Sequence, residues 1–291
     1  MHALAQSVIL GILTGGVYAL MASGQTLIFG IMKVVNLAQG AMVIMAAYLT
    51  YQLFTWWGID PFLSIPITTV IMFGVGVAVE FFLLRPLRRE DRSELSLLVT
   101  FAVALLIEGC LTLVWSPTPV TVKTSYQNSS WVVFGYHIVA VKLYGFVLSI
   151  VMLGILYLLL NKTRFGRAIR ATVQNPESAR LLGVEPSRVS AIGFGVGAAT
   201  AGAAGAVFAM LNQFNPNSHY DLISFLLSII LLGGLGSIGG AVVGAIIISV
   251  SYQVVMVYSP AWAPMTYFVI IILVLLFRPQ GLFGKVGRGA I

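Results

Sequence analysis

Long apolar runs, separated by short polar loops, restrict the fold of this chain more than any other feature. Nine runs can be recognised, at about 3–31, 37–53, 61–84, 95–115, 143–160, 190–211, 223–235, 239–257 and 264–278. A transmembrane helix needs about 20 residues, within a range of roughly 17–25, so most of the runs can cross a bilayer. The runs 37–53 and 264–278 are short, and 223–235 is too short to cross alone.

The composition excludes a soluble protein. Hydrophobic residues make up 59% of the 291 residues and charged residues only 9%, against roughly 45–50% and about 25% in soluble domains. Within lipid only helices and closed barrels satisfy their own backbone groups, and the runs are far longer than barrel strands of roughly 10 residues. We therefore predict an all-α polytopic membrane protein with about eight or nine transmembrane segments, forming a single membrane-spanning domain over residues 1–291. The first run exceeds the roughly 7–15 residues of a signal-peptide core, so we expect it to be the first span.

Lysine and arginine predict the orientation. With the N-terminus outside, fourteen basic residues fall inside and two, Lys123 and Lys142, fall outside, which follows the positive-inside rule. The fourteen are Lys33, Arg85, Arg88, Arg89, Arg92, Lys162, Arg164, Arg167, Arg170, Arg180, Arg188, Arg278, Lys285 and Arg288. The C-terminus and 161–190 then lie inside and 116–142 outside. If 223–257 re-enters instead of crossing twice, the N-terminus lies inside. The net charge of +7 thus reflects topology and not nucleic-acid binding.

Two glycine-rich interruptions predict broken helices. They lie in FGIMKVVNLAQGAMVIMAAYL (29–49) and LLGGLGSIGGAVVGA (231–245). Non-helical backbone within a membrane is tolerated only inside protein or beside a water-filled cavity, and paired breaks indicate an internal pseudo-repeat around a transporter's central site. The translocation-path candidates are Asn36, Gln39, Gly40, Gly236, Ser237, Gly239 and Gly240. The alternative role of their polar side chains is to cap helix ends. Small residues at Gly193, Gly197, Ala201 and Gly205 instead predict close helix packing.

The sequence carries no recognisable catalytic or metal-binding constellation. Glu108 stands within an apolar run, where a charge is costly, so we expect it to be protonated or to face protein in a structural pair. We expect His2, His137 and His219 to be isolated near surfaces, and the single cysteine, Cys110, to be a small core residue. A GxxxxGK[ST] nucleotide loop is absent from the sequence. The chain is therefore expected to be no enzyme and to bind no cofactor or metal itself.

The internal loop 161–190 contains the signals of a short capped helix. Asn175 can cap a helix that begins at Pro176, Glu177 complements its dipole, and Gly183 follows its end. A helix of about two turns is marginal alone, so we predict that it docks on a partner, with Ala179 and Leu182 facing a groove. The coupling candidates are Arg170, Asn175, Pro176, Glu177, Ala179, Arg180, Leu182 and Gly183. Alternatively, the loop only fixes topology, and its arginines contact lipid phosphates.

Five motifs occur in order through nearly the whole chain. They are GGVYALMASGQTLIFGIMKVVNLAQGAM (15–42), RPLR (85–88), TRFGRAIRATVQNPESARLLGV (163–184), GGLGSIGGAVVGA (233–245) and LLFRPQGLFG (275–284). In these motifs the sequence resembles the permease subunits of branched-chain amino acid ABC importers of the LivH type. The outer segment SYQNSSWVVFGYHIV (125–139) gives no information about the substrate.

The resemblance implies a multi-pass permease of the bacterial inner membrane with a cytoplasmic C-terminus. Its substrates would be branched-chain or other small apolar amino acids, or alternatively urea or short amides. The implied partners are a second related permease, two cytoplasmic ATPases that bind ATP and magnesium, an extracytoplasmic substrate-binding protein and membrane lipid. Three other classes compete with this interpretation. An ion-coupled transporter needs midplane coupling groups, for which only Glu108 qualifies; a passive channel leaves the capped helix without a purpose; a membrane enzyme lacks a catalytic constellation.

Overall fold

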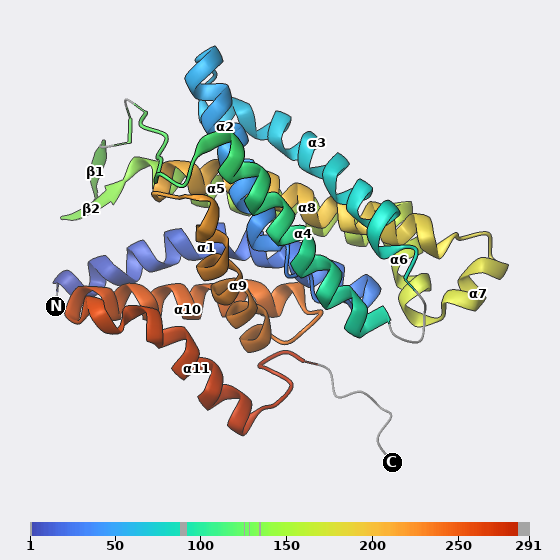
Figure 1. Cartoon of the computed structure of the whole chain (residues 1–291). Coiled ribbons are helices and arrows are strands. Elements are labelled where there is room, and N and C mark those ends of the chain that lie inside the picture. The colour runs from blue at the N-terminus through green and yellow to red at the C-terminus, as the bar shows by residue number, and fades with distance from the viewer. Residues whose placement is uncertain (1, 88–91, 125, 128, 134, 285–291) are drawn as a thin grey trace.

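The computed structural model describes residues 2–87, 92–124, 126–127, 129–133 and 135–284, and most of them belong to helices (Figure 1). The α-helices are α1 (His2–Met32), α2 (Gln39–Trp57), α3 (Pro61–Val79), α4 (Arg92–Trp115), α5 (Ala140–Lys162), α6 (Arg164–Gln174), α7 (Pro176–Leu181), α8 (Pro186–Leu211), α9 (His219–Gly233), α10 (Ile238–Tyr258) and α11 (Ala263–Phe277). The shorter elements are the π-helical turn η1 (Glu80–Leu84), the 3-10 turns η2 (Pro216–Ser218) and η3 (Pro260–Trp262), and the antiparallel strands β1 (Ser130–Val133) and β2 (Tyr136–Val139).

Each of the nine apolar runs forms a helix, which confirms the predicted all-α polytopic fold class. Within the described ranges, seven helices are long and apolar enough to cross a membrane. They are α1, α3 with η1, α4, α5, α8, α10 and α11 with η3. The remaining two runs form α2 and α9, which are the short run 37–53 and the run 223–235 that is too short to cross alone. The last run gains the necessary length because η3 precedes it.

One end of the bundle carries the N-terminus together with the hairpin of β1 and β2 (Figure 1). Gln6 Oε1 accepts a hydrogen bond from His137 N at 3.1 Å. Tyr126 OH donates to Asp60 Oδ2 at 2.8 Å, which ties the loop before β1 to the start of α3. Burial, and then the Asp60 carboxylate, raise the pKa of Tyr126 above its usual value, so this phenol stays a donor. We call this end the hairpin end.

The opposite end carries α6 and α7, and we call it the α7 end. Arg85, after η1, lies 3.9 Å from Glu185, which precedes α8. Leu282 N donates to Leu232 O at 2.8 Å, so residues 278–284 pack here too. From this end α10 runs back along α1 to the hairpin end (Figure 1). The prediction that 223–257 crosses twice stays a prediction, because α9 has 15 residues and is not among the helices long enough to span. Four predicted inside residues lie outside the described part of the chain: Arg88, Arg89, Lys285 and Arg288.

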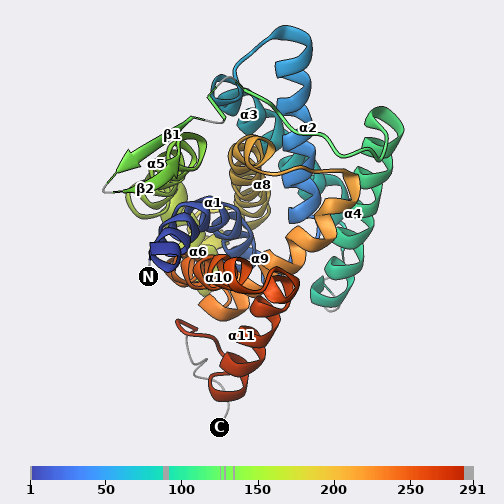
Figure 2. The ribbon, with the colours of Figure 1, turned by 90° about the vertical axis from the view of Figure 1, so that its left-hand side faces the viewer.

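Helix α8 forms the centre of the bundle and packs against α1, α2 and α3 (Figure 2). Its small residues permit close backbone approach, because a Cβ at Gly202 would lie 2.8 Å from Thr68 O of α3. A Cβ at Gly197 would lie 2.8 Å from Gly24 O of α1. The packing role predicted for the small residues of this helix is therefore confirmed, and it follows the small-residue packing common between membrane helices.

Helices α4, α5 and α11 expose large apolar side chains on the outside of the bundle. Leu113 on α4 and Phe277 on α11 are among the most exposed. An apolar surface of this extent fits lipid or another membrane subunit. Cys110 also lies exposed on α4, so the expectation that it is a core residue is wrong. A helix that is apolar all round gives no sequence signal for which face is buried.

Candidate functional site

The first predicted break lies deep inside the bundle. Helix α1 ends at Met32 and α2 begins at Gln39, whose Nε2 donates to Gly197 O, in the middle of α8, at 3.2 Å. Asn36 Oδ1 accepts from Ala38 N at 3.1 Å, and Asn36 Nδ2 donates to Gln39 Oε1 at 3.2 Å. Both side chains are fully buried. The non-helical backbone is thus satisfied by protein, as membrane depth requires.

The second predicted break lies at the α7 end, between α9 and α10. Gly234 and Gly236 adopt left-handed backbone angles of φ +97° and +84°, which favour glycine. Ser237 Oγ accepts from Gly240 N at 3.1 Å and caps α10. Gly239 is exposed, with open space around its Cβ position. Ser237 therefore performs the alternative, helix-capping role, whereas Asn36 stabilises the turn before α2 through Ala38 N and does not cap the helix itself. The two breaks make no hydrogen bond with each other among the described residues.

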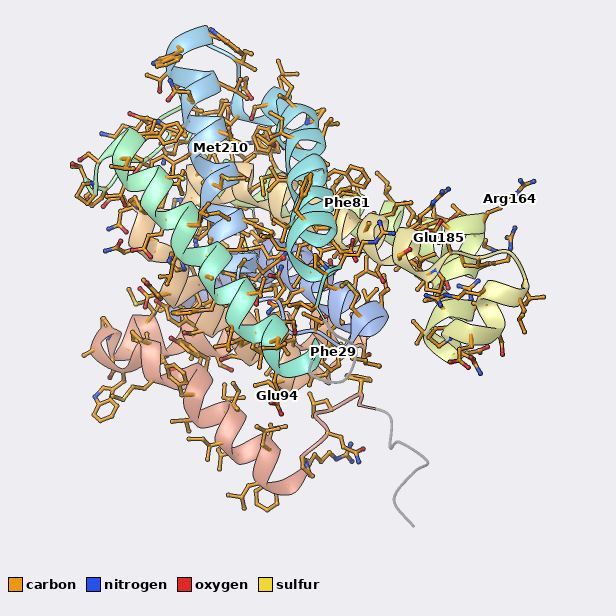
Figure 3. The ribbon with its side chains drawn as sticks, turned by 45° about the vertical axis from the view of Figure 1, so that its right-hand side comes forward. Phe29, Phe81, Glu94, Arg164, Glu185 and Met210 are labelled. Carbon is orange, nitrogen blue, oxygen red and sulfur yellow. The ribbon has the colours of Figure 1, made fainter. Side chains whose placement is uncertain are left out.

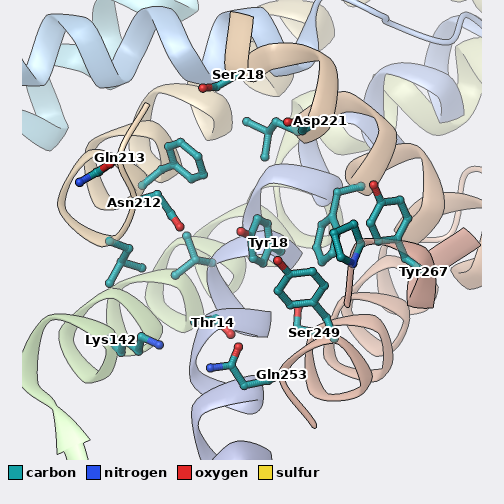
Figure 4. Close-up of a pocket in the computed structure, with 17 residues that line it drawn as sticks. Thr14, Tyr18, Lys142, Asn212, Gln213, Ser218, Asp221, Ser249, Gln253 and Tyr267 are labelled. Carbon is teal, nitrogen blue, oxygen red and sulfur yellow. The ribbon is translucent and has the colours of Figure 1, made fainter. Parts of the chain in front are cut away.

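A cavity of about 420 Å³ lies between α1, α5, α8, α9, α10 and α11 (Figure 4). It occupies the half of the bundle nearer the hairpin end, since it reaches the last turn of α8 and the first turns of α5, α9 and α11. Its walls combine apolar side chains such as Val17 and Phe225 with Lys142, Asn212 and Asp221. Each of the seven predicted path residues lies outside this lining. Sequence reasoning missed the cavity because six separate helices and the loop after α8 contribute to it.

A polar cluster around the buried His219 joins α4 to α9 near the cavity. Glu108 Oε2 lies 2.9 Å from His219 Nε2 and 2.9 Å from Tyr220 OH. The expected structural pairing of Glu108 is confirmed. His219 is only 2% exposed, so the expectation that it is isolated near a surface is wrong. Its carbonyl oxygen lies 2.7 Å from where a Cβ at Gly40 would stand, so the start of α2 packs directly on the start of α9.

The short helix predicted within the loop 161–190 forms as α7, and a further helix, α6, precedes it. Asn175 Oδ1 accepts from Glu177 N and from Ser178 N, both at 3.0 Å, and Pro176 occupies the first helical position. Gly183 follows the helix with φ +80°. A side-chain cap at one end and a left-handed glycine at the other are the features that stabilise isolated helix ends.

The exposure of α7 corrects one detail of the prediction. Ala179 is 1% exposed and belongs to the internal packing of the loop, so its side chain cannot meet a partner. Leu181 and Leu182 are 90% and 79% exposed, which leaves them as the large apolar side chains that α7 presents. Arg164 at the start of α6 points away from the bundle (Figure 3), whereas Arg170 Nη1 donates to Leu160 O at 2.6 Å.

Residues 7–277 match the family described as "Branched-chain amino acid transport system / permease component". The chain belongs to this permease family. The permease is 29% identical to the probable branched-chain amino acid transport permease protein LivH of Methanocaldococcus jannaschii, over 94% of this chain and 90% of that protein. It is 28% identical to the high-affinity branched-chain amino acid transport system permease proteins LivH of Escherichia coli and BraD of Pseudomonas aeruginosa. The alignment with the Escherichia coli protein covers 94% of each chain. The alignment with the Pseudomonas aeruginosa protein covers 96% of this chain and 95% of that protein. No solved structure matches the permease significantly.

Proposed function

We propose that this permease is the membrane subunit of an ATP-driven importer for branched-chain or other small apolar amino acids. The family match along nearly the whole chain carries the proposal. The α7 end holds most of the basic residues, so we assign it to the cytoplasm together with the C-terminus, and the hairpin end to the outside. A substrate-binding protein would then deliver to the hairpin end, and two ATPases would bind ATP and magnesium at the α7 end. A second related permease would complete the path.

The surface of α7 supports this coupling. Apolar side chains that stand almost fully in water, such as Leu181 and Leu182, gain free energy when a partner covers them, at about 1.5–3 kcal/mol for each fully buried leucine. Glu177 and Arg180 would lie at the polar rim of the groove that receives them. The buried side chain of Ala179 holds α7 against the rest of the chain. A movement of an ATPase bound to Leu181 and Leu182 would therefore be transmitted to the helix bundle.

The predicted path residues have different parts in this proposal. The first break, with Asn36, Gln39 and Gly40, is separated from the cavity by α9. Gly40 packs on the start of α9, and the following residues of α9 line the cavity. The residues of the first break would border the path only when α2 and α9 separate. Gly236, Ser237, Gly239 and Gly240 would then border its cytoplasmic exit.

The test is reconstitution. The permease is co-expressed with the ATPases and the second permease that the proposal requires, purified, and placed in liposomes with the binding protein. We expect leucine uptake that needs both ATP and the binding protein and that survives ionophores. A Leu182→Asp variant should insert normally but lose the ATPases on purification, whereas Ser187→Asp on α8 in the same loop should retain them. Uptake that needs no ATP and stops when an ion gradient is removed would instead identify an ion-coupled transporter. Uptake of urea without uptake of leucine would replace amino acids by urea or short amides as the substrate class.

A further inference from the structure

The cavity between α1, α5, α8, α9, α10 and α11 carries two opposite formal charges. Lys142 on α5 and Asp221 on α9 lie on opposite sides of it in Figure 4. Among the described lining residues these are the only ones with a formal charge near neutral pH. They make no ion pair or hydrogen bond with each other or with another side chain in the described part of the chain. The cavity therefore offers one cationic and one anionic partner, both available.

The rest of the lining separates these charges with apolar surface and a few polar atoms. Val17, Leu222 and Phe225 form apolar wall, and the cavity has the size of ordinary small-molecule sites. Ser249 Oγ lines the cavity, is 2% exposed, and has no hydrogen-bond partner among the described residues. A buried hydroxyl without a partner is costly, so this atom also points to an occupant with a polar group.

We propose that this cavity is a transit site for a zwitterionic α-amino acid. The Lys142 ammonium faces its carboxylate, the Asp221 carboxylate faces its ammonium, and the apolar wall receives its side chain. An inorganic anion would be repelled by Asp221, and an inorganic cation by Lys142, whereas a zwitterion satisfies both. Urea and simple amides use neither charge. The inference rests on the proposed function and specifies how its substrate is recognised.

The position of the cavity suits a site that receives substrate and then releases it. It lies in the half of the bundle that we assign to the outside, where a binding protein would deliver. Asp221 is exposed and Lys142 only half-buried, so both charges keep part of their hydration. Binding is consequently weak enough for onward passage. The start of α9, which carries Asp221, packs on the start of α2, so the cavity adjoins the contact between α9 and the deep break.

A cysteine reporter tests the site without requiring transport. Thr14 lines the cavity, and its hydroxyl already donates to Leu10 O at 2.9 Å, so Thr14→Cys removes no group that the ligand needs. The variant is made with Cys110→Ser, reconstituted in nanodiscs with its co-purifying subunits, and treated with a hydrophilic maleimide; labelling is read on this chain alone. Leucine should slow labelling by the factor 1 + [L]/Kd, about elevenfold at ten times the Kd. Leucinol, which lacks the carboxylate, and 4-methylpentanoate, which lacks the ammonium, should protect at least about tenfold less effectively. A reporter at Ser129→Cys, outside the cavity, should show no protection.

Charge variants then assign each partner. Lys142→Met should make leucine no better than leucinol, and Asp221→Asn should make leucine no better than 4-methylpentanoate. Lys123→Met, the same charge change at the hairpin end, should leave protection unchanged. The comparison of the three ligands on the Thr14→Cys reporter alone remains decisive if a charge variant fails to fold. Equal protection by all three ligands, or none by leucine in a complex that transports leucine, overturns the zwitterion site and leaves the importer intact. Selective protection by leucine in a complex with no ATP-dependent uptake supports the zwitterion site and overturns the proposed importer function.

Discussion

Removing the cap of α7 should weaken the attachment of the ATPase in a measurable way. Asn175 Oδ1 accepts hydrogen bonds from the backbone N–H groups of Glu177 and Ser178, both at 3.0 Å. In an Asn175→Ala variant both N–H groups lose this acceptor. Loss of such a cap costs about 0.5–2 kcal/mol. Helices shorter than about 12–15 residues are marginal in water, and α7 has six residues, so it has little stability in reserve.

The magnitude follows from the two-state equilibrium of α7. A cost of about 0.5–2 kcal/mol lowers the ratio of formed to unformed helix by roughly 2- to 30-fold. If the ATPase binds only the formed helix, its apparent Kd rises as the formed fraction falls. The internal packing of Ala179 opposes unfolding, so we expect an increase in Kd of about 2- to 10-fold, within that range.

The assay is a titration of the purified ATPase onto the permease in nanodiscs, with stimulated ATP hydrolysis as a second measurement. Asn175→Ser is the matched control, because serine also accepts at a helix N-terminus, and it should keep a Kd close to the native one. Native affinity in Asn175→Ala would show that docking does not depend on the formed helix. An equal loss in both variants would show that the amide itself, and not the cap, contacts the ATPase.

Three further predictions concern topology and packing. In intact cells an impermeant thiol reagent should label cysteine at Ser129 but not at Ser178; labelling only of Ser178 would invert our assignment of the two ends. Gly202→Ala should lower the free energy of unfolding in detergent by about 1–3 kcal/mol, because its Cβ overpacks against α3. Gly154→Ala, with open space at its Cβ position, should leave it unchanged. Equal melting temperatures for the two variants would contradict the packing argument. Glu108→Leu should cost about 1–3 kcal/mol because the buried histidine of α9 loses its partner, and Glu108→Gln should cost less, since it keeps an acceptor.

Features decided by neighbouring residues could be predicted from the sequence. The apolar runs became helices because lipid leaves the backbone few alternatives. Asn175, Pro176 and Gly183 identified α7 because a cap acts within one helical turn. The break after α1 was visible for the same reason, since Asn36 and Gln39 interrupt an apolar stretch.

Features that depend on which helices meet were decided by the tertiary structure. The sequence contained Glu108 and His219 but not their contact, and it assigned Lys142 only to the outer side of the membrane. It also could not assign Cys110 to the surface or Ala179 to the interior. The physical reason is that lipid and a protein interior are both apolar, so membrane helices lack the polar face that reveals, in a soluble protein, which side packs on a neighbour.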